Sequence, residues 1–162
     1  MTKFRIISAA VVSVVMLATS AFAQDFQKGF EAYNAGDYAT AMQEWRPLAE
    51  QGHAQAQDML GAMYTKGEGV LQDYAEAVKW FRLAAEQGYA DAQNNLGWMY
   101  YIGVLQENVL AHMWLNLGAA NGSKNGPKNR DFVAEKMTPQ EIAQAQEMAR
   151  ECMSNDYKNC GY

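Results

Sequence analysis

The sequence is poor in the residues that most catalytic and metal sites require. Its 162 residues include only two cysteines, two histidines and three prolines. It also lacks an excess of positive charge, because 13 Lys and Arg residues are outnumbered by 18 Asp and Glu residues, for a net charge of −5. An acidic chain lacks the electrostatic footprint of a nucleic-acid binder, so we exclude DNA and RNA as partners. A composition that is 49% hydrophobic and 12% aromatic excludes a disordered chain and fits one compact domain, at most two.

A short apolar run near the N-terminus indicates export. Lys3 and Arg5 precede the apolar residues Ile6–Ala18, and Ala21–Ala23 then supplies the small residues of a cleavage site. The run is too short to span a bilayer core of about 30 Å comfortably, and no cysteine follows it for lipid attachment. The sequence therefore predicts a Sec-type signal peptide over residues 1–23, cleaved after Ala23. We expect a periplasmic or secreted mature chain with no membrane anchor, whose net charge falls from −5 to −7 as two basic residues are lost.

The two cysteines fit this compartment. Cys152 and Cys160 lie close together near the C-terminal end, and such a pair is expected to form a disulfide in an oxidising environment. A zinc site would need two further ligands, and the only histidines, His53 and His112, lie far away in the sequence. We therefore predict a disulfide, with no metal site and no cofactor.

Internal repetition at a spacing of 36 residues organises the rest of the sequence. The segment Asp37–Ala41 recurs at Asp73–Ala77, and Leu60-Gly61 recurs at Leu96-Gly97. A third, shortened copy begins at Glu107, 34 residues after Asp73. One helix-turn-helix unit has this length, and stacked copies bury an apolar face that a single copy cannot. We therefore expect an all-α fold, an α/α solenoid of about three units. The expected units are residues 26–52, 53–88 and 89–122 of a repeat region that covers 24–122.

Each unit carries the end signals of its helices. Asp73 is a predicted N-cap, because its carboxylate can accept hydrogen bonds from first-turn amides, and Gly88 is a predicted left-handed C-cap. The next helix is expected over Ala90–Ile102. In the helix expected between Asp73 and Gly88, apolar residues recur at steps of three and four, at Ala77, Trp80, Phe81, Ala84 and Ala85.

Small and large residues alternate at fixed positions of the units. Gly61 and Gly97 occupy equivalent places inside a helix, which indicates a close approach of neighbouring helices. Trp80 and Trp114 share one register, and we expect both to pack between helices. This is the pattern by which two helices interdigitate at short distance.

The repeated residues resemble the signature of the Sel-one-like repeat (SLR) family, a tetratricopeptide-like α/α solenoid. The signature residues stand here at Ala56, Leu60, Gly61, Tyr64, Gly67, Gly69, Val70, Asp73, Ala77, Trp80, Ala84, Ala85 and Gly88. The resemblance covers about residues 26–122. The first unit departs from it, with Trp45 one place late and Pro47 inside its second helix, and the third keeps only Gly103 of its Gly-x-Gly pair. The resemblance implies a scaffold that binds other proteins, often in bacterial export or envelope signalling, and no reaction.

Residues 123–162 are expected to form a connector, a capping helix and a disulfide tail. Residues 123–130 are rich in glycine, asparagine and lysine and are interpreted as a solvated loop. Thr138–Glu141 is a capping box with proline at the first helical position. The amphipathic helix that follows would cover the open end of the repeat stack. The disulfide should then hold Tyr157 and the end of this helix in place.

An enzymatic function is not indicated. After loss of the leader only Ser123 and Ser154 remain as serines, and neither lies in a nucleophile motif. His112 is interpreted as a packing residue and His53 as a variable position, and the carboxylates are dispersed. We therefore favour a periplasmic protein-binding scaffold, an adaptor or regulator. One alternative is a hydrolase or binder directed at an envelope glycan or a β-lactam, since some cysteine-rich relatives are associated with β-lactam binding. Another is a structural subunit of an envelope assembly.

A stripe of aromatic and polar residues is the candidate binding surface. In solenoids of this class the first helix of each unit lines the concave face. Asn94, Trp98 and Tyr101 lie on one side of such a helix, three and four residues apart. The predicted partner-binding residues are Phe30, Tyr33, Asp58, Asn94, Trp98 and Tyr101. The alternative is that these aromatics pack against the next unit or the cap.

Overall fold

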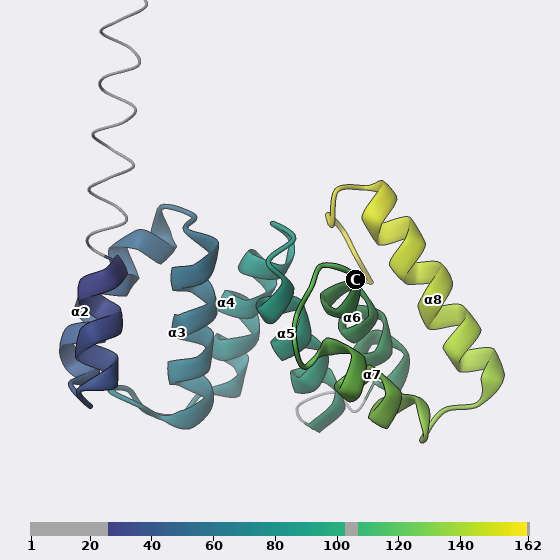
Figure 1. The fold of residues 1–162 in the computed structure, drawn as a ribbon, viewed down its shortest axis with the longest axis horizontal. Helices are drawn as coiled ribbons and strands as arrows, with labels where there is room; N and C mark the ends of the chain where they lie inside the picture. The colour runs from purple at the N-terminus through teal and green to yellow at the C-terminus, as the bar shows by residue number, and fades with distance from the viewer. Residues whose placement is uncertain (1–25, 103–106, 162) are drawn as a thin grey trace, which may run out of the picture.

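The computed structural model describes residues 26–102 and 107–161, and all regular secondary structure in this part of the chain is helical. The expected leader, its cleavage site and Gly103 lie outside the described residues. The helices follow one another along the long axis of the molecule (Figure 1). They are residues 26–34, α2 (Tyr38–Glu50), α3 (Ala54–Lys66), α4 (Tyr74–Ala85), α5 (Ala90–Ile102), α6 (Asn108–Ala120), α7 (Gly126–Ala134) and α8 (Pro139–Ser154). The all-α helical repeat solenoid expected from the sequence is confirmed. None of these described helices combines the length and apolarity needed to cross a bilayer.

The predicted N-caps are present in the structure. The Asp37 carboxylate accepts a hydrogen bond from the Thr40 amide at 3.1 Å, and Asp73 accepts one from the Glu76 amide at 3.0 Å. Each bond satisfies a first-turn amide that has no partner within the helix. Gly88 has φ +78°, a conformation that glycine adopts without strain. The C-cap of α4 is Glu86, so the left-handed Gly88 follows the helix end by two residues instead of capping it as predicted.

Glycines inside α3 and α5 let the two helices of one unit approach closely. A Cβ atom on Gly97 would lie 2.7 Å from Leu115 Cγ and 2.9 Å from the Ala111 carbonyl oxygen of α6. At Gly61 the nearest atoms are those of the Phe81 ring of α4, at 2.6 Å. The close approach predicted from the repeated glycine is therefore real. It brings backbone near backbone at Gly97, whereas it makes room for a buried ring at Gly61.

Buried glutamines join each unit to the one before it. Gln57 donates to the Ala49 carbonyl oxygen at 2.9 Å, and Gln93, 36 residues later, donates to the Ala85 carbonyl oxygen at 3.1 Å. Both glutamine side chains are buried, so these bonds satisfy groups that would be costly to leave unpaired. The donors to the two glutamine oxygens, at 2.7 and 2.8 Å, are the side-chain amides of Gln87 and Asn121.

The equivalent tryptophans are not equally buried. Trp45 and Trp114 are fully buried, and Trp45 takes the place that Phe81 holds one unit later, 36 residues on. Trp80 packs against the α2–α3 core but is only half-buried. The expectation that Trp80 and Trp114 pack alike is therefore wrong in part. Trp114 has its surroundings filled on all sides, whereas one side of Trp80 borders an open cleft.

The C-terminal cap consists of two helices, not one. Residues 126–130 belong to α7, so the prediction of a solvated loop there is wrong. Tertiary packing outweighs local composition in this segment, because Val133 is fully buried and a Cβ on Gly126 would lie 2.6 Å from the Ala119 amide nitrogen of α6. The capping box at the start of α8 is confirmed, with Thr138 and Glu141 bonded reciprocally. Helices α7 and α8 both pack on α6.

The tail after α8 returns to the repeats. Cys152 and Cys160 form the expected disulfide, with their Cα atoms 5.1 Å apart. Between them, the Tyr157 hydroxyl donates to Asn121 Oδ1 at 3.1 Å, and its ring lies against Gly88. Figure 1 shows this segment running back from the end of α8 toward α6. The disulfide thus ties the tail to α8, and the Tyr157 hydroxyl fixes it on the end of the third unit.

Candidate partner-binding groove

A small groove lies between α3 and α5, the first helices of the second and third units. Its volume is about 140 Å³, enough for an apolar side chain rather than a whole ligand. The walls are mainly apolar, with an amide and an ammonium group among them. The groove is lined by Ala62, Thr65, Lys66, Phe81, Asn95, Trp98 and Met99.

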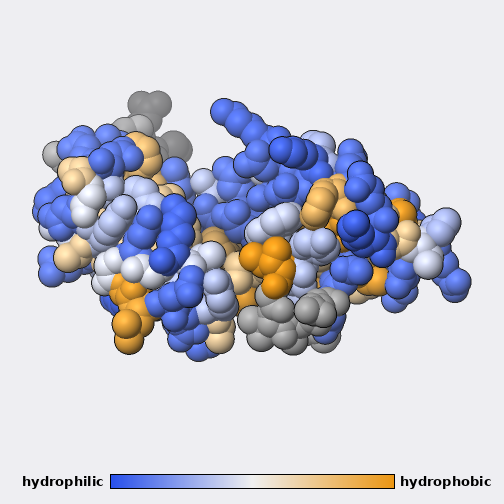
Figure 2. Space-filling view, turned by 90° about the horizontal axis from the view of Figure 1, so that it is seen from below, coloured by the Kyte–Doolittle hydropathy of each residue, from blue (hydrophilic) through white to orange (hydrophobic). Residues whose placement is uncertain are grey.

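Exposed hydrophobic side chains elsewhere are scattered. Figure 2 shows one face of the molecule, on which hydrophobic side chains form small separate patches among hydrophilic ones. The most exposed large hydrophobic residue in the described part of the chain is Leu71, at 91%. Single exposed apolar residues are normal on protein surfaces. An apolar concavity with an aromatic wall is the more informative feature.

An aromatic cluster of Trp98, Tyr101 and Phe132 borders the groove. The ring centroids of Trp98 and Tyr101 are 5.4 Å apart, and those of Tyr101 and Phe132 are 5.5 Å apart. Trp98 and Tyr101 are half-buried, and Phe132 is 42% exposed. Trp98 therefore has two environments. It lines the groove, and its ring also packs against Phe132 of α7 with the ring centroids 6.1 Å apart.

Asp58 and Asn94 lie beneath this surface in a line of polar side chains. Asn95 donates to Asp58 Oδ1 at 2.9 Å, and Asn129 of α7 donates to Asn94 Oδ1 at 2.9 Å. Asp58 is 7% exposed and Asn94 is 6% exposed. Burial raises the pKa of Asp58 to about 6, although the hydrogen bond from Asn95 acts in the opposite direction. The two side chains thus link α3, α5 and α7 and offer little surface to a partner.

Phe30 and Tyr33 lie in the first unit, away from the aromatic cluster. Phe30 is 41% exposed. Tyr33 is half-buried, and its ring packs near Trp45 at a centroid distance of 5.6 Å. The Tyr33 hydroxyl donates to Glu68 at 2.6 Å and accepts from Lys66 at 2.8 Å. Because Lys66 also lines the groove, Tyr33 reaches the groove through this bond, whereas no contact between Phe30 and the groove is observed.

His112, interpreted from the sequence as a packing residue, is enclosed in the structure. His112 is 2% exposed. Burial lowers its pKa, and the nearby Arg130 lowers it further. The imidazole is enclosed by the packing around α6 and offers almost no surface to a substrate. Within residues 26–102 and 107–161, no group of three or more His, Cys, Asp or Glu side chains is placed to hold a metal ion.

Phe132 is the member of the aromatic cluster that sequence reasoning missed. It lies outside the repeats, and no periodic signal links it to Trp98 or Tyr101. The only indication was that Phe132 and Val133 are adjacent apolar residues in an otherwise polar segment. Such a pair can be part of a short packed helix, but it does not show which surface that helix contacts.

Comparison with known proteins identifies the repeats. The Sel1 repeat matches residues 54–89 and 90–123. No curated protein matches the chain. The fold is similar to that of a protective antigen present in uropathogenic Escherichia coli strains, which displays an SLR fold. The two are 27% identical with a TM-score of 0.77, over 84% of this chain and 31% of that one.

A second solved structure agrees with this result. A Sel1 repeat protein from Oxalobacter formigenes is 29% identical with a TM-score of 0.64, over 78% of this chain and 55% of that one. The chain thus spans about a third of the length of the first relative and about half of the second. Residues 54–123 thus match two Sel1 repeats, and the chain shares its fold with two solved SLR proteins.

Proposed function

We propose that this chain is an exported scaffold that binds a protein partner in the groove between α3 and α5. Sel1 repeat proteins generally mediate protein–protein interaction, which supports the class of function. The observation that carries the choice of surface is Trp98, a half-buried aromatic residue that lines an apolar groove. Half-buried aromatic residues beside polar groups are typical of the residues that dominate binding energy at interfaces.

The predicted site residues take different parts in this proposal. Trp98 and Tyr101 contact the partner, and Phe132 extends the same surface onto α7. Asp58 and Asn94 hold the helices under the surface in position, because their oxygens already accept hydrogen bonds from within the chain. The aromatic cluster is therefore preorganised, which lowers the entropy cost of ordering side chains when the partner binds.

Phe30 and Tyr33 define the other end of the proposed surface. Phe30 is exposed on the first helix of the chain's described part, where a partner long enough to pass the groove would meet it. Tyr33 contributes by orienting Lys66 at the groove wall. A partner that contacts all these residues would lie along the first helices of the units, the face that is concave in solenoids of this class.

The proposed location is the periplasm or the exterior of the cell. It rests on the signal-peptide pattern in residues 1–23 and is supported by the disulfide between Cys152 and Cys160, since disulfides persist in oxidising compartments. No described feature favours the glycan- or β-lactam-directed alternative or a structural subunit over a scaffold.

Site-directed photocrosslinking in the exporting cell tests the proposal. A photoreactive phenylalanine analogue at position 98 should crosslink one protein, and the same analogue at the exposed position of Leu71 should not. The double change Trp98→Ala and Tyr101→Ala should weaken capture of that protein at least tenfold, about 1.4 kcal/mol. Because both side chains are half-buried, each change should lower the melting temperature less than truncation of the fully buried Trp114 does. Retained capture with lost stability would assign both residues to the core, and retention on peptidoglycan alone would favour the glycan alternative.

A further inference from the structure

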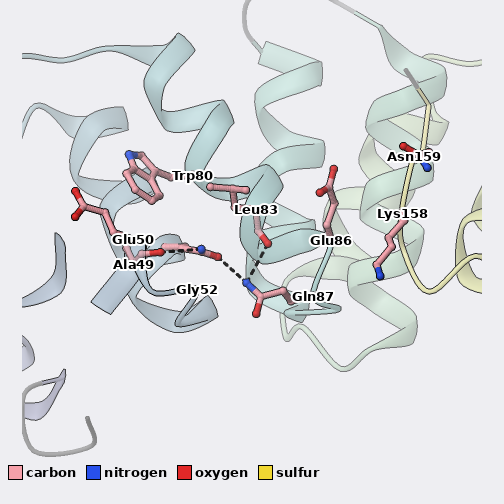
Figure 3. Close-up of a pocket in the computed structure, with 10 residues that line it drawn as sticks. Ala49, Glu50, Gly52, Trp80, Leu83, Glu86, Gln87, Lys158 and Asn159 are labelled. Atoms are coloured by element: carbon pink, nitrogen blue, oxygen red, sulfur yellow. Dashed lines mark hydrogen bonds between the residues drawn. The ribbon is translucent and has the colours of Figure 1, made fainter. Parts of the chain in front are cut away.

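A second and larger cleft lies on another side of the molecule, between the end of α2, helix α4 and the disulfide tail. Its volume is about 770 Å³, within the range of ligand-binding sites. Figure 3 shows Glu50 and Trp80 at one end of the cleft, Leu83 and Glu86 in the middle, and Lys158 and Asn159 at the other end. None of the residues that line it belongs to the groove between α3 and α5.

The cleft lies where α2 and α4 of consecutive units meet, which we call the first boundary. The repeat places an equivalent second boundary one unit later, between α4 and α6. The positions of Trp80 and Leu83 correspond to Trp114 and Leu117 there, 34 residues on. Leu83 is 46% exposed, whereas Leu117 and Trp114 are fully buried. The same two apolar positions are thus open at the first unit boundary and covered at the second.

The chain's own tail helps to cover the second boundary. A Cβ on Gly88 would lie 3.1 Å from the Tyr157 ring, whereas around Gly52, its equivalent 36 residues earlier, nothing lies within 4 Å. The Tyr157 hydroxyl also donates to Asn121 Oδ1. Tyr157 therefore shows which kind of side chain this position accepts, an aromatic ring with a hydroxyl group.

The polar group that would receive such a hydroxyl is already placed in the first cleft. At the second boundary the Asn121 amide donates to Gln93, and its oxygen accepts from Tyr157. At the first boundary the Gln87 amide donates to Gln57 at 2.7 Å. The oxygen of Gln87 is thus left to accept a hydroxyl proton, as the oxygen of Asn121 does.

The charges at the two boundaries also correspond. Lys158, which follows Tyr157, and Glu86 both line the cleft, although their charged groups point in different directions (Figure 3). The position of Glu50 is equivalent to that of Glu86, 36 residues earlier. A basic residue that follows a bound tyrosine would therefore lie near Glu50, where opposite charges attract.

We propose that the cleft between α2 and α4 binds a tyrosine-bearing turn of a partner protein in the way that the α4–α6 boundary holds Tyr157. The tyrosine ring packs on Trp80 and Leu83 beside Gly52, its hydroxyl donates to Gln87, and a following basic residue lies near Glu50. This site is separate from the groove at Trp98, so it can be tested whatever the fate of the proposed function.

The tail itself supplies the probe. A synthetic, acetylated and disulfide-cyclised peptide of residues 152–161 is titrated into the full mature chain, with binding followed by tryptophan fluorescence and calorimetry. We expect saturable binding, weakened about threefold to tenfold by Tyr157→Phe in the probe, the range expected for one lost hydrogen bond. Tyr157→Ala in the probe should abolish binding.

Matched variants of the protein locate the probe. Leu83→Ser should weaken binding at least tenfold, whereas Leu71→Ser and Trp98→Ala should not. Glu50→Lys should weaken it, and Glu135→Lys, which changes the net charge equally at the end of α7, should not. Circular dichroism confirms that each variant is folded.

Three results would overturn the proposal. The first is a lack of saturable binding up to millimolar probe. The second is equal binding of the tyrosine and alanine probes. The third is a probe affinity that Leu83→Ser leaves unchanged and that Tyr157→Ala in the protein increases. The probe would then occupy the position of the tail itself at the second boundary.

Discussion

The substitution Gly97→Ala sets two effects of opposite sign against each other. Helix propensity alone favours alanine over glycine by about 1 kcal/mol. Against this, the new methyl group would lie 2.9 Å from both the Ala111 carbonyl oxygen and the Leu115 amide nitrogen. Backbone atoms cannot rotate out of the way, so α5 and α6 would have to separate. Overpacking of this kind costs about 1–3 kcal/mol. The difference between the two effects is about 0–2 kcal/mol, so we expect Gly97→Ala to lower the free energy of unfolding by up to about 2 kcal/mol.

Urea unfolding followed by circular dichroism measures this change, and a constant m value shows that stability alone has changed. Gly61→Ala is the matched comparison, because its three nearest atoms all belong to the Phe81 ring. Adding Phe81→Ala should relieve most of the strain of Gly61→Ala, whereas adding Leu115→Ala should relieve less of that of Gly97→Ala. A stabilisation of about 1 kcal/mol by Gly97→Ala would refute the reasoning, since propensity would then decide alone.

Two further predictions concern buried side chains. The pKa of Asp58 is raised to about 6 in the folded chain. This group therefore stabilises the folded state most below its unfolded pKa, and that contribution is lost as the pH rises through 6. Asp58→Asn should make the melting temperature depend less on pH between 4 and 7, and an unchanged dependence would place the titration elsewhere. Trp114→Ala should cost about 3–5 kcal/mol of unfolding free energy, and Trp80→Ala less than half as much because its side chain is half-buried; equal losses in chemical denaturation would contradict this difference.

Local, repeated signals made the solenoid predictable from the sequence. The caps at Asp37 and Asp73, the left-handed Gly88 and the capping box at Thr138 each depend on a few neighbouring residues. The 36-residue spacing then fixed how the units succeed one another. These features need no knowledge of distant contacts, and the structure contains all of them.

Features that depend on distant contacts were not predictable in this way. Helix α7 forms in a polar segment because it packs on α6, and Phe132 joins the aromatic cluster only through that helix. Trp80 has the same register as Trp114 but different surroundings. Periodicity places a residue on a helix face, but it does not show what covers that face.

The buried glutamines determine the mechanical character of the array. Gln57 is bonded at once to the backbone of the preceding unit and to the far turn of its own unit, and Gln93 repeats this pair of bonds. Any rotation of one unit against the next must stretch the buried bond from the glutamine to the preceding unit, in an interior where no water replaces it. The array of repeats is therefore expected to be rigid, with a fixed orientation between neighbouring units. A protein partner of the proposed kind would then have to match a curvature that is set before binding.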